Sequence, residues 1–499
     1  MTYTVPHFIA GHHVMSNTLP HKDIYNPATG DVIAQVPMAD QTLCDQAVAA
    51  AKKAWPAWAD TTATKRAHIL FQFRNLLEKN QLDLAKLVNQ EQGKTIEDAK
   101  GSIARALELI EFHCGLITQL QGTFSANVSH HIDCHTFRQP IGVCAGISPF
   151  NFPVMVPTWM MIPAIACGNT FILKPSEQDP SASVRLLELL QEAGLPPGVV
   201  NCVQGDKSTV DHLLVHPDIV ALTAVASTPV AEAIYRNATA AGKRAHTFGG
   251  AKNHAVIMPD ANMALAAQAL CGAAFGSAGE RCMAISVVVA VGEDTAQHLL
   301  SELKPAIHAI KIGAGHEPGV DLGPLISQTH RQRVQKAVSQ GVTEGAHLLI
   351  DGRQFMHEQY PNGFFMGPCL FDHVTEHMSI YQDELFGPVL VIVRVNNLDE
   401  AIALINRNQY GNGTAIFTQN GYHARHYAHT IQVGMVGINV PIPVPIANHP
   451  FGGWKRSAFG DTVMHGTESI HFYTKSKTIT TKWLMQTNEQ SSFVMPENG

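Results

Sequence analysis

The chain has 499 residues, enough for about three domains, and its 34 Lys+Arg against 41 Asp+Glu give a formal net charge of -7. No excess of positive charge is available to neutralise phosphates, so a nucleic-acid partner is not expected. The nine cysteines are odd in number and form no CxxC pair, and the first twenty residues do not read as a secretion signal. We therefore expect a globular, cytoplasmic protein of enzyme size.

Two long stretches lack acidic and basic side chains, at 139–173 and 426–454. Prolines interrupt both, whereas a membrane-spanning helix needs about 20 consecutive apolar residues. We expect no membrane span, and interpret these stretches as buried backbone around an active site.

The first third of the chain predicts a helical layer followed by a β arm. Apolar residues recur at helical spacing through 41–115, and the segment 123–140 alternates like a strand hairpin. Strand alternation places His131 and His135 on one face and His130 and Cys134 on the other. These four candidate ligands therefore cannot surround one metal ion. We predict no metal.

From 141 to 227 short apolar strands alternate with helices, a pattern typical of a parallel sheet with helices on both faces and a nucleotide site at the strand ends. No GxGxxG motif follows any of these strands. A second α/β unit of about 200 residues begins after Gly250. The segment 471–484 alternates again and predicts a strand that pairs with another element or another subunit.

One cysteine stands out by its position. In the segment FGSAGERCMAIS, Cys282 follows a glycine-containing turn and precedes an apolar strand. The neighbouring Arg281 is a cation, and a cation beside a thiol favours the reactive thiolate. By itself this pattern favours a buried structural thiol over a catalytic nucleophile.

Six ordered motifs carry a wider resemblance: PFNFP (149–153), KPSE (174–177), FGG (248–250), GERC (279–282), ELFGP (384–388) and PFGG (450–453). Together they resemble the aldehyde dehydrogenase superfamily, essentially from end to end. The segments GGAKNHAVIMPDA, FGSAGERCMAIS and NVPIPVPIA are more specific. They resemble the branch that oxidises methylmalonate semialdehyde and makes an acyl-CoA.

The resemblance implies the α/β fold of that superfamily, in which the dinucleotide domain lacks GxGxxG. It implies a Rossmann-like NAD-binding domain at 1–122 and 141–248 and an α/β catalytic domain at 249–448. It also implies a β oligomerisation arm at 123–140 and 465–487, and hence a homodimer or homotetramer.

The resemblance also implies the catalytic residues. Cys282 is the nucleophile that forms a thiohemiacetal with a small-molecule aldehyde, and Asn151 donates its side-chain amide to the developing oxyanion, a contribution of about 10² to 10³ in rate. A semialdehyde carries a carboxylate, and the resemblance assigns its recognition to Arg105 and Arg281, which also suit ordinary ion pairs.

For the cofactor, Lys174 and Glu177 follow a strand, where a carboxylate accepts from ribose hydroxyls and disfavours the 2′-phosphate of NADP, so we expect NAD. Ser227, Thr228 and Pro229 read as strand end, N-cap and first helical residue, which turns N–H groups toward the pyrophosphate, although Ala226 replaces the usual glycine. The resemblance assigns the nicotinamide end to the residues Phe150, Glu384 and Phe386.

The informative departure is Thr247. Hydrolytic members of the superfamily have a glutamate in this place, and a general base commonly contributes about 10² to 10⁴ in rate. Without this glutamate, water attacks the thioacyl enzyme slowly, and an incoming thiol can react with it instead. We therefore expect coenzyme A as cosubstrate. The expected products are propionyl-CoA or acetyl-CoA, CO₂ and NADH. The alternatives are a hydrolytic semialdehyde dehydrogenase that yields a free acid, and a catalytically silent binding protein of the same fold.

Overall fold

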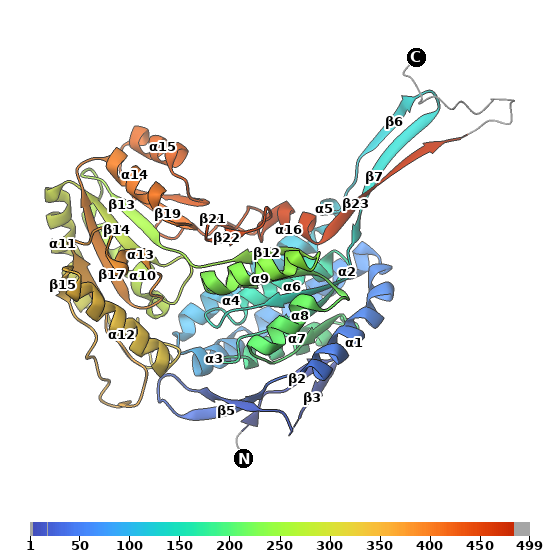
Figure 1. Cartoon of the computed structure of the whole chain (residues 1–499), viewed down its shortest axis with the longest axis horizontal. Coiled ribbons are helices and arrows are strands. Elements are labelled where there is room, and N and C mark those ends of the chain that lie inside the picture. Colours follow the sequence, from blue (N-terminus) through green and yellow to red (C-terminus); the bar gives the residue numbers. More distant parts are fainter. Residues whose placement is uncertain (1–2, 17, 484–499) are drawn as a thin grey trace.

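The computed structural model describes residues 3–16 and 18–483 (Figure 1). Two α/β bodies lie side by side, and a β arm projects from one of them. The α/β class predicted from the alternation of strands and helices is confirmed. The domain boundaries stay a prediction, and residues 484–487 of the expected arm lie outside the described residues.

The first body is built on an eight-stranded sheet whose five central strands run parallel. Its order is β22 (Ala458–Phe459), β12 (Arg244–Phe248), β11 (Ile219–Val225), β8 (Val143–Ile147), β9 (Thr170–Lys174), β10 (Val200–Cys202), β2 (His7–Ile9) and β3 (His12–Val14). The edge strands are antiparallel to their neighbours. The strand order reverses between β8 and β11, which is where ligands bind in sheets of this kind.

Helices cover both faces of this sheet, as the repeated strand and helix units predicted. One face packs against α1 (Gln41–Ala59), α8 (Lys207–Val215) and α9 (Thr228–Ala240). The other packs against α2 (Ala63–Lys79), α3 (Gln81–Gln92), α4 (Ile96–Cys114), α6 (Met155–Ala166) and α7 (Ser181–Glu192). The helical layer expected at 41–115 is therefore divided: α1 covers one face of the sheet, whereas α2, α3 and α4 belong to the other side.

The second body is a seven-stranded sheet, parallel except at the β15 edge. Its order is β15 (His347–Ile350), β16 (Cys369–Asp372), β17 (Val389–Val395), β14 (Ile285–Val291), β13 (Asn253–Ile257), β19 (Gly413–Phe417) and β20 (Met435–Ile438). Its helices are α10 (Met263–Phe275), α11 (Glu293–His308), α12 (Gln328–Thr343), α13 (Ser379–Gln382), α14 (Leu398–Arg407) and α15 (Gly421–Thr430). Alternate residues of β14 enter different cores: Val287 and Val289 pack on one side, Val288 and Ala290 on the other.

The arm is a three-stranded antiparallel sheet of β6 (Phe124–Ser129), β7 (Ile132–Pro140) and β23 (Thr474–Lys482). The predicted hairpin and the predicted tail strand are thus confirmed, and they pair with each other. Two details of the prediction are wrong. His130 and His131 form the turn, where His131 has φ 59°, and residues 471 and 472 end helix α16 (Gly466–Phe472).

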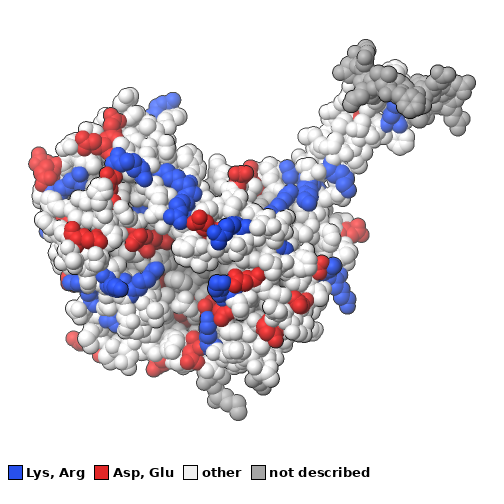
Figure 2. All heavy atoms as spheres, viewed as in Figure 1, with Lys and Arg blue, Asp and Glu red and all other residues white. Residues whose placement is uncertain are grey.

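The remaining elements are short. They are β1 (Tyr3–Thr4), β4 (His21–Tyr25), β5 (Val32–Pro37), β18 (Tyr410–Gly411), β21 (Trp454–Lys455), α5 (Leu116–Gln119) and the 3₁₀ turn at Gly276–Gly279. Among the described residues no helix is both long and apolar enough to span a bilayer. Acidic and basic side chains are interspersed over the face seen in Figure 2.

Candidate active site

The predicted cofactor and oxyanion residues converge at one edge of the first sheet. Asn151 follows β8, Lys174 ends β9, Ser227 follows β11 and Gly250 follows β12. These strands are parallel, so their carboxyl ends meet at the same edge. The topology therefore explains how residues separated by a hundred positions come to share one site.

Cys282 lies between the 3₁₀ turn and β14. The turn has left-handed backbone at Ser277 and Ala278, both with φ 53°, and at Gly279, with φ 73°. A Cβ on Gly279 would collide with the backbone carbonyl of Gly387, so glycine allows the cysteine loop to lie directly against the ELFGP loop.

Two amides fix the backbone of the nucleophile. Nδ2 of Asn253 and Nδ2 of Asn412 both donate to the carbonyl oxygen of Cys282, at 2.9 and 3.0 Å. Cys282 and Glu384 line the same pocket, together with Ala251, Arg281 and Phe386. The thiol is thus held at the wall of a cavity shared by three loops.

The thiol of Cys282 is not activated by its neighbour Arg281. Burial, and then the charge of Glu384, raise the pKa of Cys282 to about 12. The guanidinium of Arg281 points elsewhere and donates to Oδ1 of Asp98 at 2.6 Å. The prediction that Arg281 favours the thiolate is therefore wrong, because adjacency in sequence did not bring the cation to the sulfur.

Asn151 is buried and anchored from two sides. Its Nδ2 donates to the backbone carbonyl of Glu280 at 2.9 Å, two residues before Cys282, and its own carbonyl accepts from Nζ of Lys94 at 2.7 Å. Lys94 is fully buried, lies 4.1 Å from the ring centre of Phe152, and has a pKa lowered by desolvation. Sequence reasoning missed Lys94, because its partner is 57 positions away and no motif links them.

Glu280 is a second buried group that the sequence did not single out for its side chain. Its carboxylate accepts from Nε2 of Gln92 at 2.9 Å and from the N–H of Ile326 at 3.1 Å, and lies 3.5 Å from Nε2 of His330. Burial raises the pKa of Glu280 to about 8. The side chain of Glu280 therefore links α3 to the loop that carries Cys282.

Lys174 and Glu177, predicted to bind a ribose, are paired at the edge of the first sheet. Nζ of Lys174 lies 3.0 Å from Oε2 of Glu177, and Nζ of Lys22, a residue not foreseen, lies 3.4 Å from Oε1. Although burial raises the pKa of Glu177, the two lysines and a backbone N–H hold it below its usual value. An ionised carboxylate accepts hydrogen bonds, as ribose hydroxyls require.

Helix α9 begins one residue earlier than predicted. Ser227 is its N-cap and Thr228 its first residue, so Pro229 takes the second position. Oγ1 of Thr228 accepts from the N–H of Gly250 at 2.8 Å, which ties the helix start to the FGG loop. The first turn still presents its positive end at the sheet edge, as anion binding requires.

The residues predicted for the nicotinamide end lie together. Oε1 of Glu384 accepts from the N–H of Ala251 at 2.9 Å, and burial raises the pKa of Glu384 to about 7. The rings of Phe150 and Phe386 meet edge to face at 5.8 Å. Phe386 has φ 57°, and its carbonyl accepts from Nε2 of His330 at 2.6 Å, a contact that the sequence did not indicate.

The two arginines expected to bind a carboxylate are each paired within the chain. Arg105 donates to Glu108 at 2.8 Å on the same helix, with a 41% exposed side chain, and Arg281 is bound to Asp98. Both pairs involve α4, where Asp98 and Arg105 are seven residues apart and share one helix face. Among the described residues, neither guanidinium forms a hydrogen bond or an ion pair with Cys282.

Thr247 lies in β12, fully buried, and its hydroxyl donates to the backbone carbonyl of Ala231 in α9 at 2.8 Å. The side chain is therefore turned into the helix packed on the sheet. No carboxylate occupies this position to activate water.

Comparison with known proteins gives the family. The aldehyde dehydrogenase family model matches residues 13–479. The chain is 51% identical to the malonate-semialdehyde dehydrogenase of Pseudomonas aeruginosa, with 99% of both chains covered. It is 45% identical to the human mitochondrial acylating methylmalonate-semialdehyde/malonate-semialdehyde dehydrogenase, with 99% of this chain and 93% of that one covered.

Solved structures confirm the expected fold. A Sinorhizobium meliloti protein assigned as a methylmalonate-semialdehyde dehydrogenase, solved in complex with NAD, superposes with a TM-score of 0.96 at 50% identity, covering 98% of this chain and all of that one. The methylmalonate-semialdehyde dehydrogenase of Oceanimonas doudoroffii gives 0.96 at 49% identity, covering 97% and 99%. Family model, sequence identity and fold agree over nearly the whole length, and the chain belongs to the aldehyde dehydrogenase family.

Proposed function

We propose that this protein oxidises malonate semialdehyde and methylmalonate semialdehyde with NAD and transfers the acyl group to coenzyme A, giving acetyl-CoA or propionyl-CoA, CO₂ and NADH. The full-length relatives named for these two aldehydes support the substrate class. The observation that carries the acyl transfer is Thr247, which leaves the base position of the hydrolytic enzymes without a carboxylate.

In this proposal Cys282 performs the covalent chemistry. Its thiol loses a proton, and the sulfur adds to the aldehyde carbon to form a thiohemiacetal. The amide of Asn151 donates to the oxyanion, together with the backbone N–H of Cys282. The amide of Asn151 is oriented by its hydrogen bond to the carbonyl of Glu280, and Lys94 holds the backbone carbonyl of the same residue, so the amide is in place before the substrate binds.

The groups at the sheet edge fit a dinucleotide. Glu177, Lys174 and the start of α9 at Ser227 supply an ionised acceptor, a cation and a helix N-terminus in the order that a ribose and a pyrophosphate need. Glu384, Phe150 and Phe386 surround the nicotinamide end. NAD held by these residues would supply the hydride acceptor that oxidation of the thiohemiacetal to a thioester requires.

The thioester then reacts with a thiol in preference to water. Loss of the β-carboxylate as CO₂ gives the shorter acyl group, and the sulfur of coenzyme A attacks the carbonyl while Cys282 leaves as thiolate. A thiolate needs no general base, whereas water does, so the absence of a carboxylate at Thr247 slows only the hydrolytic route.

We assign recognition of the substrate carboxylate to Arg105 and Arg281. Arg281 is adjacent to the nucleophile and lines the same pocket, and its guanidinium has further donors beyond those given to Asp98 and to the backbone carbonyl of Gly272. Arg105 projects from the same face of α4 as Asp98. A carboxylate that enters this region meets two cations.

The arm supports a homodimer or homotetramer. Strand β23 pairs with β7 along nine positions, and six of its consecutive residues from Lys475 are exposed, as suits a strand that meets another subunit. We also propose a cytoplasmic location, because all nine cysteines are unpaired, as a reducing compartment requires.

The deciding experiment measures NADH formation from malonate semialdehyde with NAD, with and without coenzyme A, and identifies the products. We expect steady turnover only with coenzyme A, with acetyl-CoA and CO₂ as products. Equal rates without coenzyme A, yielding free malonate, would assign the protein to the hydrolytic class. A Cys282→Ala variant that retains the wild-type rate would remove the enzymatic assignment altogether.

A further inference from the structure

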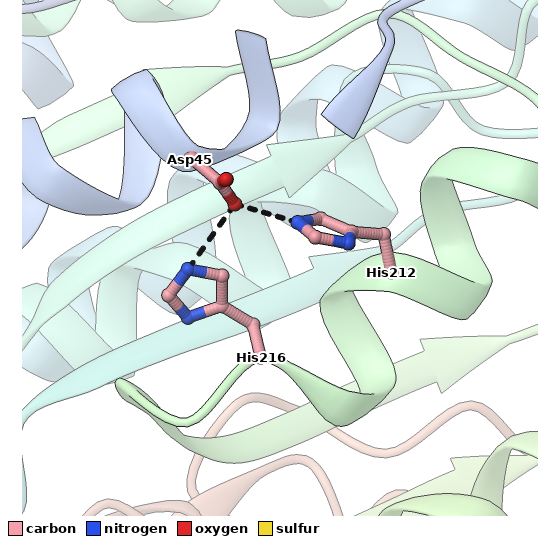
Figure 3. Close-up of side chains that lie close together, drawn as sticks. All are labelled: Asp45, His212 and His216. Atoms are coloured by element: carbon pink, nitrogen blue, oxygen red, sulfur yellow. Dashed lines mark hydrogen bonds and ion pairs between the residues drawn. The ribbon is translucent and has the colours of Figure 1, made fainter. Parts of the chain in front are cut away.

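A cluster of three metal-ligating side chains lies on the first body, on the helix-covered face formed by α1, α8 and α9. Asp45, His212 and His216 come from α1 and the end of α8, and one ligand atom of each lies within 4.8 Å of the others (Figure 3). Nε2 of His212 lies 2.6 Å and Nε2 of His216 3.4 Å from Oδ1 of Asp45. None of the three belongs to the site described above.

Helical spacing explains the arrangement. His212 is in the last turn of α8 and His216 is its C-cap, so the two imidazoles are four residues apart and project from the same side. Asp45 lies in the second turn of α1, which packs against α8. Figure 3 shows both rings directed at the carboxylate.

We propose that Asp45, His212 and His216 form a binding site for a divalent cation of the zinc class, with water as the remaining ligand. Two imidazoles and one carboxylate suit Zn²⁺. Ligands at about 2.0 Å from a tetrahedral zinc lie about 3.3 Å from one another. The 3.4 Å between Oδ1 of Asp45 and Nε2 of His216 is already close to this distance. The 2.6 Å between Oδ1 of Asp45 and Nε2 of His212 must lengthen, which a change of rotamer at the exposed carboxylate allows.

The ring of His216 is available as a neutral ligand. Burial lowers the pKa of His216, which favours the neutral imidazole that binds metal. One hydrogen bond opposes ligation: Nδ1 of His216 accepts from the N–H of Asp218 at 3.2 Å, so binding through Nε2 moves the ring proton to Nδ1 and breaks that bond. This bond is long, and its loss weakens the site without blocking it.

The charges around the cluster leave room for a cation. Lys52 is neutralised by Asp218 at 2.6 Å, and Lys243 donates to the backbone carbonyls of His216 and Ile219. The two lysines thus have partners other than the Asp45 carboxylate. The Asp45 side chain is 56% exposed while those of His212 and His216 are 19% and 11% exposed, so the cation has an open approach and the imidazoles are held in place.

A cation here would tie α1 to the end of α8. Because the site involves none of the catalytic residues, its effect falls on stability and leaves the turnover number unchanged. No sequence motif predicts this cation site, because Asp45 and His212 are 167 positions apart.

The test is a zinc titration of the full-length protein by calorimetry, with the thermal midpoint measured in parallel. Three variants are compared: His212→Gln, Asp45→Asn and, as a matched control, His426→Gln. His426 is also paired with an aspartate, Asp399, at 3.0 Å, but has no second imidazole there. Zinc binding to Cys282 or to other histidines is common to all four proteins and cancels in the comparison.

We expect the wild type and His426→Gln to bind one more equivalent of zinc than His212→Gln, and zinc to raise their thermal midpoint but not that of His212→Gln. Asp45→Asn, which keeps both imidazoles, should bind at least tenfold more weakly. Zinc-dependent anomalous scattering in a crystal should give a peak between the three side chains. Equal stoichiometry and equal midpoint shifts in wild type and His212→Gln would show a hydrogen-bonded His–Asp–His cluster only and overturn the proposal.

Discussion

The amide of Asn151 donates to the backbone carbonyl of Glu280 at 2.9 Å, which ties the end of β8 to the loop that carries Cys282. Asn151 follows a strand of the first sheet, and Glu280 lies in the connection that leads into β14 of the second sheet. This hydrogen bond therefore joins the proposed oxyanion donor to the loop of the proposed nucleophile, whose backbone is held in addition by Asn253 and Asn412.

Replacing Asn151 should reduce turnover far more than stability. Asn151→Ala removes the oxyanion donor and should lower kcat by about 10² to 10³, with a smaller change in KM. Asn201→Ala is the control, because Asn201 is an equally buried amide that donates to Gly198 at 2.8 Å in the same sheet, away from the pocket. Equal losses of kcat in both variants would mean that Asn151 is only structural.

Glu384 should restrain the reactivity of the free thiol. Since the pKa of Cys282 is about 12 and that of Glu384 about 7, alkylation of Cys282 by iodoacetamide should accelerate with pH, and above pH 7 the charged Glu384 should slow it. Glu384→Gln should therefore react faster than wild type above pH 7 and equally below about pH 6. Peptide mapping separates Cys282 from the other partly exposed thiols. A variant that reacts at the wild-type rate at pH 9 would contradict the electrostatic coupling.

Glu280 should make stability depend on pH. Its folded pKa of about 8 lies above the value of an unfolded glutamate, so the folded state retains a proton that the unfolded state loses. Stability from this group is complete below about pH 4 and falls as pH rises toward 8. Glu280→Gln keeps an acceptor for Gln92 and cannot ionise, so its thermal midpoint should fall less between pH 5 and 9. Parallel pH profiles for the two proteins would contradict this.

Thr247→Val should leave the chemistry intact. The variant loses the hydrogen bond to Ala231, a cost of about 1 kcal/mol and hence a shift of about 1 °C in thermal midpoint for a chain of this size. The requirement for coenzyme A should persist, because valine supplies no base. Loss of turnover in a folded Thr247→Val protein would show that the hydroxyl takes part in the reaction.

Arg281 should act on carboxylated substrates alone. Arg281→Gln should raise KM for malonate semialdehyde about tenfold or more, while kcat/KM for propanal, which has no carboxylate, should change little. Because Asp98 then loses its partner, the thermal midpoint should also be recorded. An equal loss for both aldehydes would mean that Arg281 serves only to position the loop.

The sequence predicted what local pattern and motif determine, and failed where long-range contacts decide. Alternation of strands and helices identified both sheets, and the motifs singled out Asn151 and Lys174, which lie at the edge of the first sheet, and Glu384, which lies in the loop before β17. The orientation of Arg281 could not be predicted, because Asp98, 183 positions away, competes for its charge. Lys94 was equally hidden, since a lysine in a helical layer normally remains in solvent.

Strand β23 completes the arm by pairing with β7 across more than 330 positions. During synthesis the hairpin of β6 and β7 emerges long before its third strand, and it presents an open row of backbone donors and acceptors in the meantime. Closing such a distant contact is slow. The arm is therefore the part of the chain most exposed to mispairing with a neighbouring nascent copy until β23 has been synthesised.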